Sequence, residues 1–167
     1  MKYTSAAANK LLKQLQGEYS DLVYNERLSC VFVAATVENL EEARPEYSYE
    51  ALQERLEELD RQIRTIKHAI NVFNTTTTVD GFGMTIDQML VYIPQLSAMK
   101  DRLSGLTKVL PKRRLDNTTG TSLVEYQYAN YDVARAKADY DRVCKTLNQA
   151  QLALDRLNTT ETMEIEL

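Results

Sequence analysis

Glycine, proline, cysteine and histidine are all scarce in this sequence. Five glycines and three prolines among 167 residues predict long regular elements joined by few turns. The two cysteines, Cys30 and Cys144, are far apart and form no CxxC motif, so we expect reduced, packed thiols and no metal or redox motif. The longest purely apolar run, residues 30–35, is too short to cross a bilayer, and the first residues lack the apolar stretch of a secretory signal. These shortages predict a cytoplasmic protein without a cofactor or metal.

Neither sign of charge dominates the chain. Charged residues make up 26% and hydrophobic residues 44%, with a net charge of −4, which is typical of a soluble globular protein. The negative charge gives no overall reason to expect nucleic acid or an anionic membrane as a partner. A chain of this length is expected to form one helical domain, residues 1–167.

Two long stretches have the apolar spacing of helices that pack lengthwise. Over residues 52–73 the large apolar residues alternate in spacing between four and three positions, which is an unbroken a/d seam. A second seam covers residues 133–157. Two such seams in one chain predict an intramolecular antiparallel coiled coil or bundle. The first seam consists of Leu52, Leu56, Leu59, Ile63, Ile66, Ile70 and Phe73, and the second of Val133, Ala136, Tyr140, Val143, Leu147, Ala150, Leu154 and Leu157.

We therefore predict a mainly α fold: long antiparallel helical hairpins, or a coiled-coil-like four-helix bundle, with a small β element. Thr4 or Ser5 can cap the first helix, Thr85 and Gln88 form a capping box, and Pro94 is expected to kink a helix without breaking it. The predicted helices cover residues 5–28, 48–74, 85–110 and 132–158; short strands cover 30–37, 123–130 and 162–167; and a mobile loop covers 111–122.

The residues needed for catalysis are not gathered in any recognisable pattern. His68 is the only histidine, and its place between two seam positions predicts a solvated side chain on the outer face of the helix. Thr65 stands three residues before it, so the Glu-x-x-His motif of di-iron bundles is not formed. Residues 81–83 (Gly-Phe-Gly) lack the third glycine and the following lysine of a phosphate-binding loop. We expect that the protein is not an enzyme.

Two predicted helices end in the same Asn-Thr-Thr sequence. Asparagine tolerates the left-handed conformation that closes many helices, so the shared sequence is explained by a shared stop signal. If the two helices run parallel, their ends instead meet at one pole of the bundle and form a polar binding cluster. That candidate cluster consists of Asn71, Asn74, Thr75, Thr76, Asn158, Thr159 and Thr160.

Lys108, Lys112, Arg113 and Arg114 form a candidate anion-binding patch. Long helical hairpins can grip RNA through such a patch. Cations at the C-terminal end of a helix also suit the helix dipole, and neighbouring aromatic residues for base stacking are missing from this part of the sequence. A basic helix end is therefore the preferred interpretation.

The chain contains four distinctive segments: residues 66–76 (IKHAINVFNTT), 83–87 (GMTID), 124–132 (VEYQYANYD) and 151–160 (QLALDRLNTT). These segments resemble the septicolysin-like family of bacterial proteins. The resemblance covers most of the chain from about residue 47 onward. It implies a mainly helical fold and carries over no catalytic residue, since the family is largely uncharacterised; its name suggests a haemolysin.

These observations together favour a non-enzymatic interaction or structural protein, an oligomerising helical bundle. Ten tyrosines and five methionines suit contacts between copies, although they suit a core equally well. One alternative is a helical hairpin that binds RNA or DNA through residues 108–114, and another is a membrane-active, lysin-like protein. The charge-rich helix faces do not resemble a basic interfacial helix. We expect a homo-oligomer, with room for a protein partner, and do not expect nucleic acid or a membrane as partner.

Overall fold

The structure, a computed structural model, describes residues 1–115 and 124–167. Over these residues the fold is mainly α with short antiparallel strands, which confirms the predicted fold class. The chain divides into two compact units, one made of Met1–Asn74 with Asn158–Leu167 and the other of Thr75–Leu157. Compactness does not decide whether the two units unfold separately, so the expected single domain stays a prediction.

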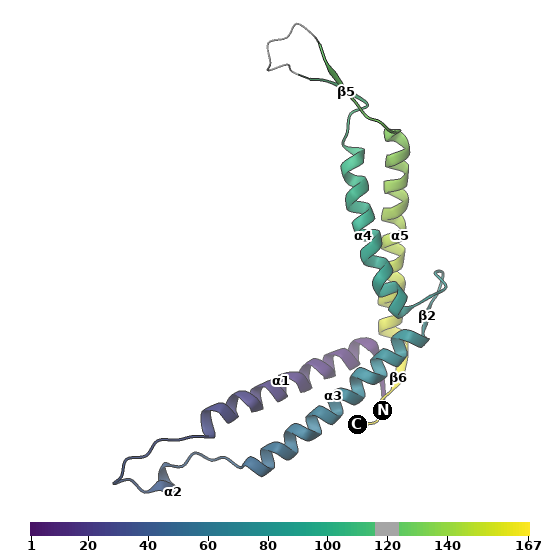
Figure 1. The fold of residues 1–167 in the computed structure, drawn as a ribbon. Coiled ribbons are helices and arrows are strands. Elements are labelled where there is room, and N and C mark those ends of the chain that lie inside the picture. The colour runs from purple at the N-terminus through teal and green to yellow at the C-terminus, as the bar shows by residue number, and fades with distance from the viewer. Residues whose placement is uncertain (116–123) are drawn as a thin grey trace. The chain divides into compact units, whose positions relative to one another are not determined.

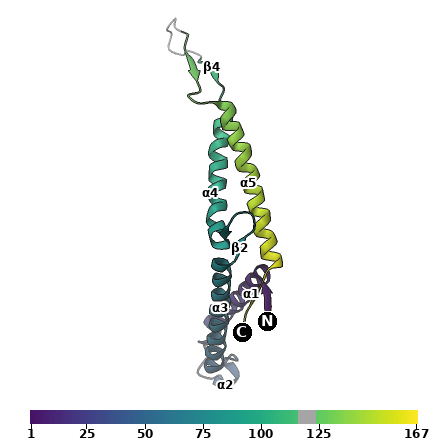
Figure 2. The ribbon, with the colours of Figure 1, turned by 90° about the vertical axis from the view of Figure 1, so that its right-hand side faces the viewer.

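The first unit contains an antiparallel helical hairpin. α1 (Ser5–Ser29) and α3 (Tyr49–Thr76) lie side by side (Figures 1 and 2), and the connection between them contains the single-turn α2 (Leu40–Ala43). Thr4, one of the two residues predicted to cap the first helix, caps α1. Its Oγ1 accepts a hydrogen bond from the Ala7 N–H at 3.2 Å. An ion pair between Arg55 on α3 and Glu18 on α1 joins the helices along their length.

The first apolar seam supplies the core of this unit. Ala8 and Leu15 of α1 are buried as well, and each fully buried leucine or isoleucine contributes about 1.5–3 kcal/mol of transfer free energy. Every residue of the seam is covered: Leu56, Leu59, Ile66, Ile70 and Phe73 are buried, and Leu52 and Ile63 are half-buried.

The two ends of the chain pair in the first unit. β1 (Lys2–Thr4) runs antiparallel to β6 (Thr162–Glu164), and the Ile165 N–H donates to the Met1 carbonyl at 2.9 Å. Met163 and Ile165 are buried, so the alternation that predicts a strand over residues 162–167 is confirmed for its first half. The sequence did not indicate β1, because three residues are too few to show a period of two.

The second unit is built on another antiparallel pair, α4 (Ile86–Thr107) and α5 (Val133–Thr160), which lie side by side in both views (Figures 1 and 2). The capping box is confirmed, since the Gln88 N–H donates to Thr85 Oγ1 at 3.3 Å and Gln88 Oε1 accepts from the Thr85 N–H at 2.9 Å. α4 continues through Pro94 without a break and ends three residues before the predicted 110. Every residue of the second seam is buried or half-buried.

A tight hairpin precedes α4. β2 (Thr78–Val79) pairs with β3 (Met84–Thr85), and the turn between them places Gly81 at φ 81° and Gly83 at φ 62°. Side chains other than glycine rarely adopt these angles. The turn buries Val79 almost completely and so anchors the start of the second hairpin.

The strand predicted over residues 30–37 is wrong. Those residues form irregular backbone that ends in a turn, in which the Glu38 N–H donates to the Ala35 carbonyl at 3.0 Å and Glu38 Oε2 accepts from the Ala35 N–H at 2.8 Å. A strand needs a partner for its backbone groups, and this segment, which links α1 to α2, pairs with no strand in the described part of the chain. Strand pairing therefore does not explain why this segment is rich in apolar residues.

Candidate functional site

The predicted basic patch folds into a two-stranded ribbon in the second unit. Lys112, Arg113 and Arg114 make up the whole of β4 (Lys112–Arg114), which pairs antiparallel with β5 (Tyr126–Tyr128). The Ala129 N–H donates to the Pro111 carbonyl at 3.1 Å and the Leu115 N–H to the Glu125 carbonyl at 2.9 Å, so hydrogen bonds close the ribbon at both ends. We call β4 and β5 together the basic–aromatic ribbon.

Lysine and tyrosine side chains meet on one face of this ribbon. Lys112 lies opposite Tyr128, and Arg114 lies opposite Tyr126; because side chains alternate along a strand, all four belong to the same face. The Lys112 Nζ lies 4.2 Å from the Tyr126 ring centroid and 5.5 Å from that of Tyr128, which is the geometry of a cation–π contact. Both tyrosines, Lys112 and Arg114 are exposed, so this face is open to a ligand.

The ribbon corrects one part of the sequence analysis. Aromatic residues appeared to be missing near the cations, whereas strand pairing brings Tyr126 and Tyr128 directly beside them. The alternating strand predicted over 123–130 is confirmed at residues 126–128, but its partner was placed in a mobile loop. Residues 112–114 of that loop form β4, and its residues 116–122 lie outside the described part of the chain.

Two further contacts fix the base of the ribbon. Lys108 is the C-cap of α4, as expected for a cation that suits the helix dipole. The Tyr131 hydroxyl donates to the Leu106 carbonyl at 2.7 Å, which satisfies one of the free carbonyls of the helix end. Asp132 then caps α5, because its Oδ1 accepts from the Ala134 N–H at 2.9 Å. The ribbon is thereby attached to both helices of its hairpin.

The predicted polar cluster at the Asn-Thr-Thr ends lies inside helices. α3 extends to Thr76 and α5 to Thr160, and positive φ angles occur only at glycines among the described residues, so neither Asn74 nor Asn158 closes its helix in the left-handed conformation. The predicted cluster residues belong to both units: Thr75 and Thr76 to the second, and Asn71, Asn74, Asn158, Thr159 and Thr160 to the first. Asn71, Thr75, Thr76, Thr159 and Thr160 already have interaction partners.

Large apolar side chains are exposed where α1 connects to α3. Val33 is 97% and Val37 95% exposed, although soluble proteins rarely leave contiguous apolar patches uncovered. The β-branched residues of this segment predict a strand, which the segment does not form. We call the following residues the apolar tip: Leu28, Val31, Phe32, Val33, Val37 and Leu40.

The end of the apolar tip and the residues that follow it along the chain are rich in carboxylates. Residues 38–50 contain five glutamates and a single arginine, Arg44, and all five glutamates are exposed. Arg44 lies 3.4 Å from the carboxylate of Glu41 in an exposed pair. The apolar tip therefore leads into an acidic stretch of the chain, residues 38–50, which we call its acidic margin.

A hydrogen bond holds the connection against α1. The Tyr47 hydroxyl donates to Glu26 Oε1 at 3.1 Å, beside a depression of about 180 Å³ that is also lined by Leu22 and Leu52. Partial burial raises the pKa of Tyr47, and the hydrogen bond to Glu26 raises this pKa further. Both effects favour the neutral phenol, so this tyrosine acts as a structural hydrogen-bond donor.

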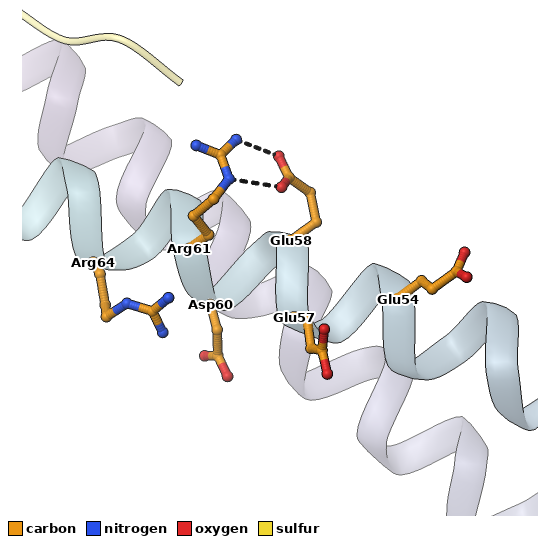
Figure 3. A pocket seen from close by; sticks show the side chains of 6 residues that line it. All are labelled: Glu54, Glu57, Glu58, Asp60, Arg61 and Arg64. Atoms are coloured by element: carbon orange, nitrogen blue, oxygen red, sulfur yellow. Dashed lines mark hydrogen bonds and ion pairs between the residues drawn. The ribbon is translucent and has the colours of Figure 1, made fainter.

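The outer side of α3 carries an open, charged depression of about 500 Å³ (Figure 3). In Figure 3 the Arg61 guanidinium faces the carboxylate of Glu58; Arg61 Nε donates to Glu58 Oε2 at 2.8 Å and Nη2 donates to Oε1 at 2.7 Å. Hydrogen bonding from Arg61 lowers the pKa of Glu58 to about 2. The remaining lining residues, Glu54, Glu57, Asp60 and Arg64, are exposed. This arrangement is a solvated charged face, as the seam predicts for the opposite side of the helix.

The remaining chemically distinctive residues are isolated. His68 is exposed, as predicted. Cys144 is half-buried, but Cys30 is exposed. The prediction of two packed thiols is therefore wrong for Cys30, because this residue follows the last residue of α1 and lies outside the helical core. A hydrogen bond with Cys144 is the main reason why the pKa of Tyr140 is raised. Among the described residues, groups of three or more histidine, cysteine or acidic side chains that could hold a metal ion are not found.

Comparisons with known proteins show a shared fold but indicate no activity for this protein. Neither a protein-family model nor a curated protein matches the sequence. A crystal structure from Corynebacterium diphtheriae, described as that of a functionally unknown conserved protein, is similar, with a TM-score of 0.57 and 20% sequence identity. The similarity covers 98% of this chain and 100% of that chain. At this identity the likeness shows a shared fold and leaves the resemblance to the septicolysin-like family untested.

Within the described residues, each helix is either too short or too polar to cross a membrane.

Proposed function

We propose that this protein is a non-enzymatic interaction or structural protein that self-associates. The observation that carries this proposal is the apolar tip, where large side chains such as Val33 and Val37 are almost fully exposed. Covering such side chains removes apolar surface from water at about 25 cal/mol per Å². An exposed patch of this kind is typical of a protein–protein contact.

The helix seams themselves are not available for self-association. The residues of both seams are covered inside the two units, so a second copy would have to open a hairpin in order to use them. We therefore assign self-association to the surfaces at and beyond the ends of the hairpin helices, where the most exposed of the valines, Val33 and Val37, lie.

Light scattering over a hundredfold range of protein concentration tests this proposal. We expect the mean mass to rise with concentration above that of a single chain. A mass that stays at one chain throughout this range would contradict self-association, whichever surface is used.

Nucleic-acid binding through the basic–aromatic ribbon is the second candidate function. It is favoured by one specific observation, the contact of Lys112 with the rings of Tyr126 and Tyr128. Exposed aromatic rings beside cations can stack on unpaired bases while the cations neutralise phosphates. The exposed cations Arg113 and Arg114 belong to the same ribbon.

A fluorescent single-stranded oligonucleotide, titrated at two salt concentrations, tests this second function. If the ribbon binds it, affinity falls steeply with salt, and the double variant Arg113→Ala, Arg114→Ala weakens binding about tenfold or more. The matched control is Lys10→Ala with Lys13→Ala, two exposed cations of α1, which we expect to change affinity little. Equal loss in both double variants would indicate non-specific attraction.

We further propose a cytoplasmic location. It is supported by the exposed, unpaired thiol of Cys30, because such a thiol persists in a reducing compartment.

A further inference from the structure

The apolar tip and the basic–aromatic ribbon carry opposite charge. Residues 38–50, around the tip, contain five glutamates against one arginine. Around the ribbon, residues 108–115 and 124–131 contain four cations and a single carboxylate, that of Glu125. The two surfaces belong to different units of the chain.

Both surfaces also expose apolar area. Val31 and Leu40 of the tip are 75% and 58% exposed, and Leu110 and Tyr128 beside or within the ribbon are 60% and 61% exposed. A contact between the surfaces would therefore bury apolar side chains at its centre and pair opposite charges at its margin. That is the usual composition of a specific interface.

We infer that the apolar tip of one copy docks on the basic–aromatic ribbon of a second copy, so that the chains assemble head to tail. This inference rests on the proposed self-association and names the two surfaces that produce it. Because the contact joins two different surfaces, each pair of chains keeps one free tip and one free ribbon. Assembly therefore continues beyond the dimer until a ring closes.

Electrostatic repulsion disfavours a contact between two tips or between two ribbons. If two tips met, their glutamates would face one another, and if two ribbons met, their cations would do so. Like charges brought together across an interface repel each other, which carries a free-energy cost. The tip–ribbon contact avoids this cost.

Charge also favours a second copy over the other occupants. A membrane surface is neutral or negative and offers the acidic margin of the tip no counter-charge. A nucleic acid would match the ribbon and leave the tip uncovered. A second copy covers both surfaces with a single kind of contact.

Two variants, each damaged at one surface, test the inference. Val33→Glu places a charge in the apolar tip, and Arg113→Glu with Arg114→Glu reverses the charge of the ribbon. The matched controls change equally exposed residues elsewhere: Leu152→Glu on α5, where Leu152 is 70% exposed, and Lys10→Glu with Lys13→Glu on α1. Circular dichroism verifies that every variant is folded, and sedimentation velocity over a range of concentrations measures the association.

We expect each damaged variant alone to associate at least about tenfold more weakly than the native chain, and the controls to associate like the native chain. Mixing the two damaged variants in equal amounts should form a particle of two chains that does not grow, because one intact tip meets one intact ribbon. Association of the native chain should weaken as the salt concentration is raised from 0.05 to 0.5 M, by screening.

Other outcomes overturn the inference in distinguishable ways. A native chain that stays monomeric refutes both self-association and the tip–ribbon contact. If the native chain associates but one damaged variant still associates as strongly alone, or the mixture forms no pair, the tip–ribbon contact is refuted and self-association stands. Binding of the monomeric native chain to a single-stranded oligonucleotide or to phosphatidylcholine vesicles would assign the surface to nucleic acid or lipid instead.

Discussion

Truncation of Leu59 to alanine tests the packing of the first hairpin most directly. Leu59 is fully buried and stands in the middle of the seam on α3. Removing its terminal carbon atoms leaves a cavity that two long helices cannot close without bending. We expect Leu59→Ala to lower the free energy of unfolding by about 2–5 kcal/mol.

The size of this effect can be measured by denaturation in urea. With a denaturant slope of about 2 kcal/mol per M, a loss of about 3 kcal/mol moves the midpoint down by about 1.5 M. The same loss lowers the melting temperature by about 6–12 °C, because each kcal/mol corresponds to about 2–4 °C in a chain of this size.

Leu152→Ala is the matched control for Leu59→Ala. Leu152 is 70% exposed, so its truncation should change the unfolding free energy by less than about 0.5 kcal/mol. If the two leucine variants were equally stable, the assignment of the seam to the core would be refuted.

A third variant, Met89→Ala, tests the predicted single domain from the second unit. Met89 is fully buried in α4. If the chain is one cooperative domain, Leu59→Ala and Met89→Ala shift the same single transition. Two transitions, each sensitive to one variant, would show two domains.

Two further predictions concern local contacts. Arg61→Gln should raise the pKa of Glu58 from about 2 toward its ordinary value of 4.5, as measured by carboxyl-carbon NMR. Because the pKa of Glu58 is lower in the folded state, the stabilisation from this pair is fully present above about pH 4.5 and is lost as the pH falls toward about 2. If the pKa of Glu58 were unchanged in Arg61→Gln, Arg61 would not be the cause of the low pKa. Thr85→Ala, which removes the capping box of α4, should cost about 0.5–2 kcal/mol in urea unfolding, whereas Thr85→Ser should keep most of that stability; equal losses in the two variants would contradict a role for the hydroxyl.

Sequence periodicity determined the helices well, because the signal is local. In the seam from Leu52 to Phe73 and in the capping box of Thr85, the contacts that stabilise a helix lie within four residues along the chain. The predicted starts of the four long helices lie within one residue of the observed starts. The largest error at a helix end is three residues, at Thr107, where the apolar spacing continues beyond the last helical turn.

Strand pairing could not be predicted in the same way. A strand is stabilised by a partner that can lie anywhere in the chain, and β1 and β6 come from opposite ends of this sequence. The valine-rich segment at residues 30–37 has the composition of a strand and finds no partner strand among the described residues. Lys112 and Tyr128 are cross-strand neighbours that no spacing rule connects.

The sequence by itself therefore determined which residues are helical and which faces of α3 and α5 are buried. Tertiary structure alone decided that the cations of residues 112–114 lie beside two tyrosines and that Val31, Val33 and Val37 are exposed. The physical reason is range: helix formation depends on residues within about one turn of each other, whereas strand pairing and the exposure of a connection depend on segments far apart along the chain.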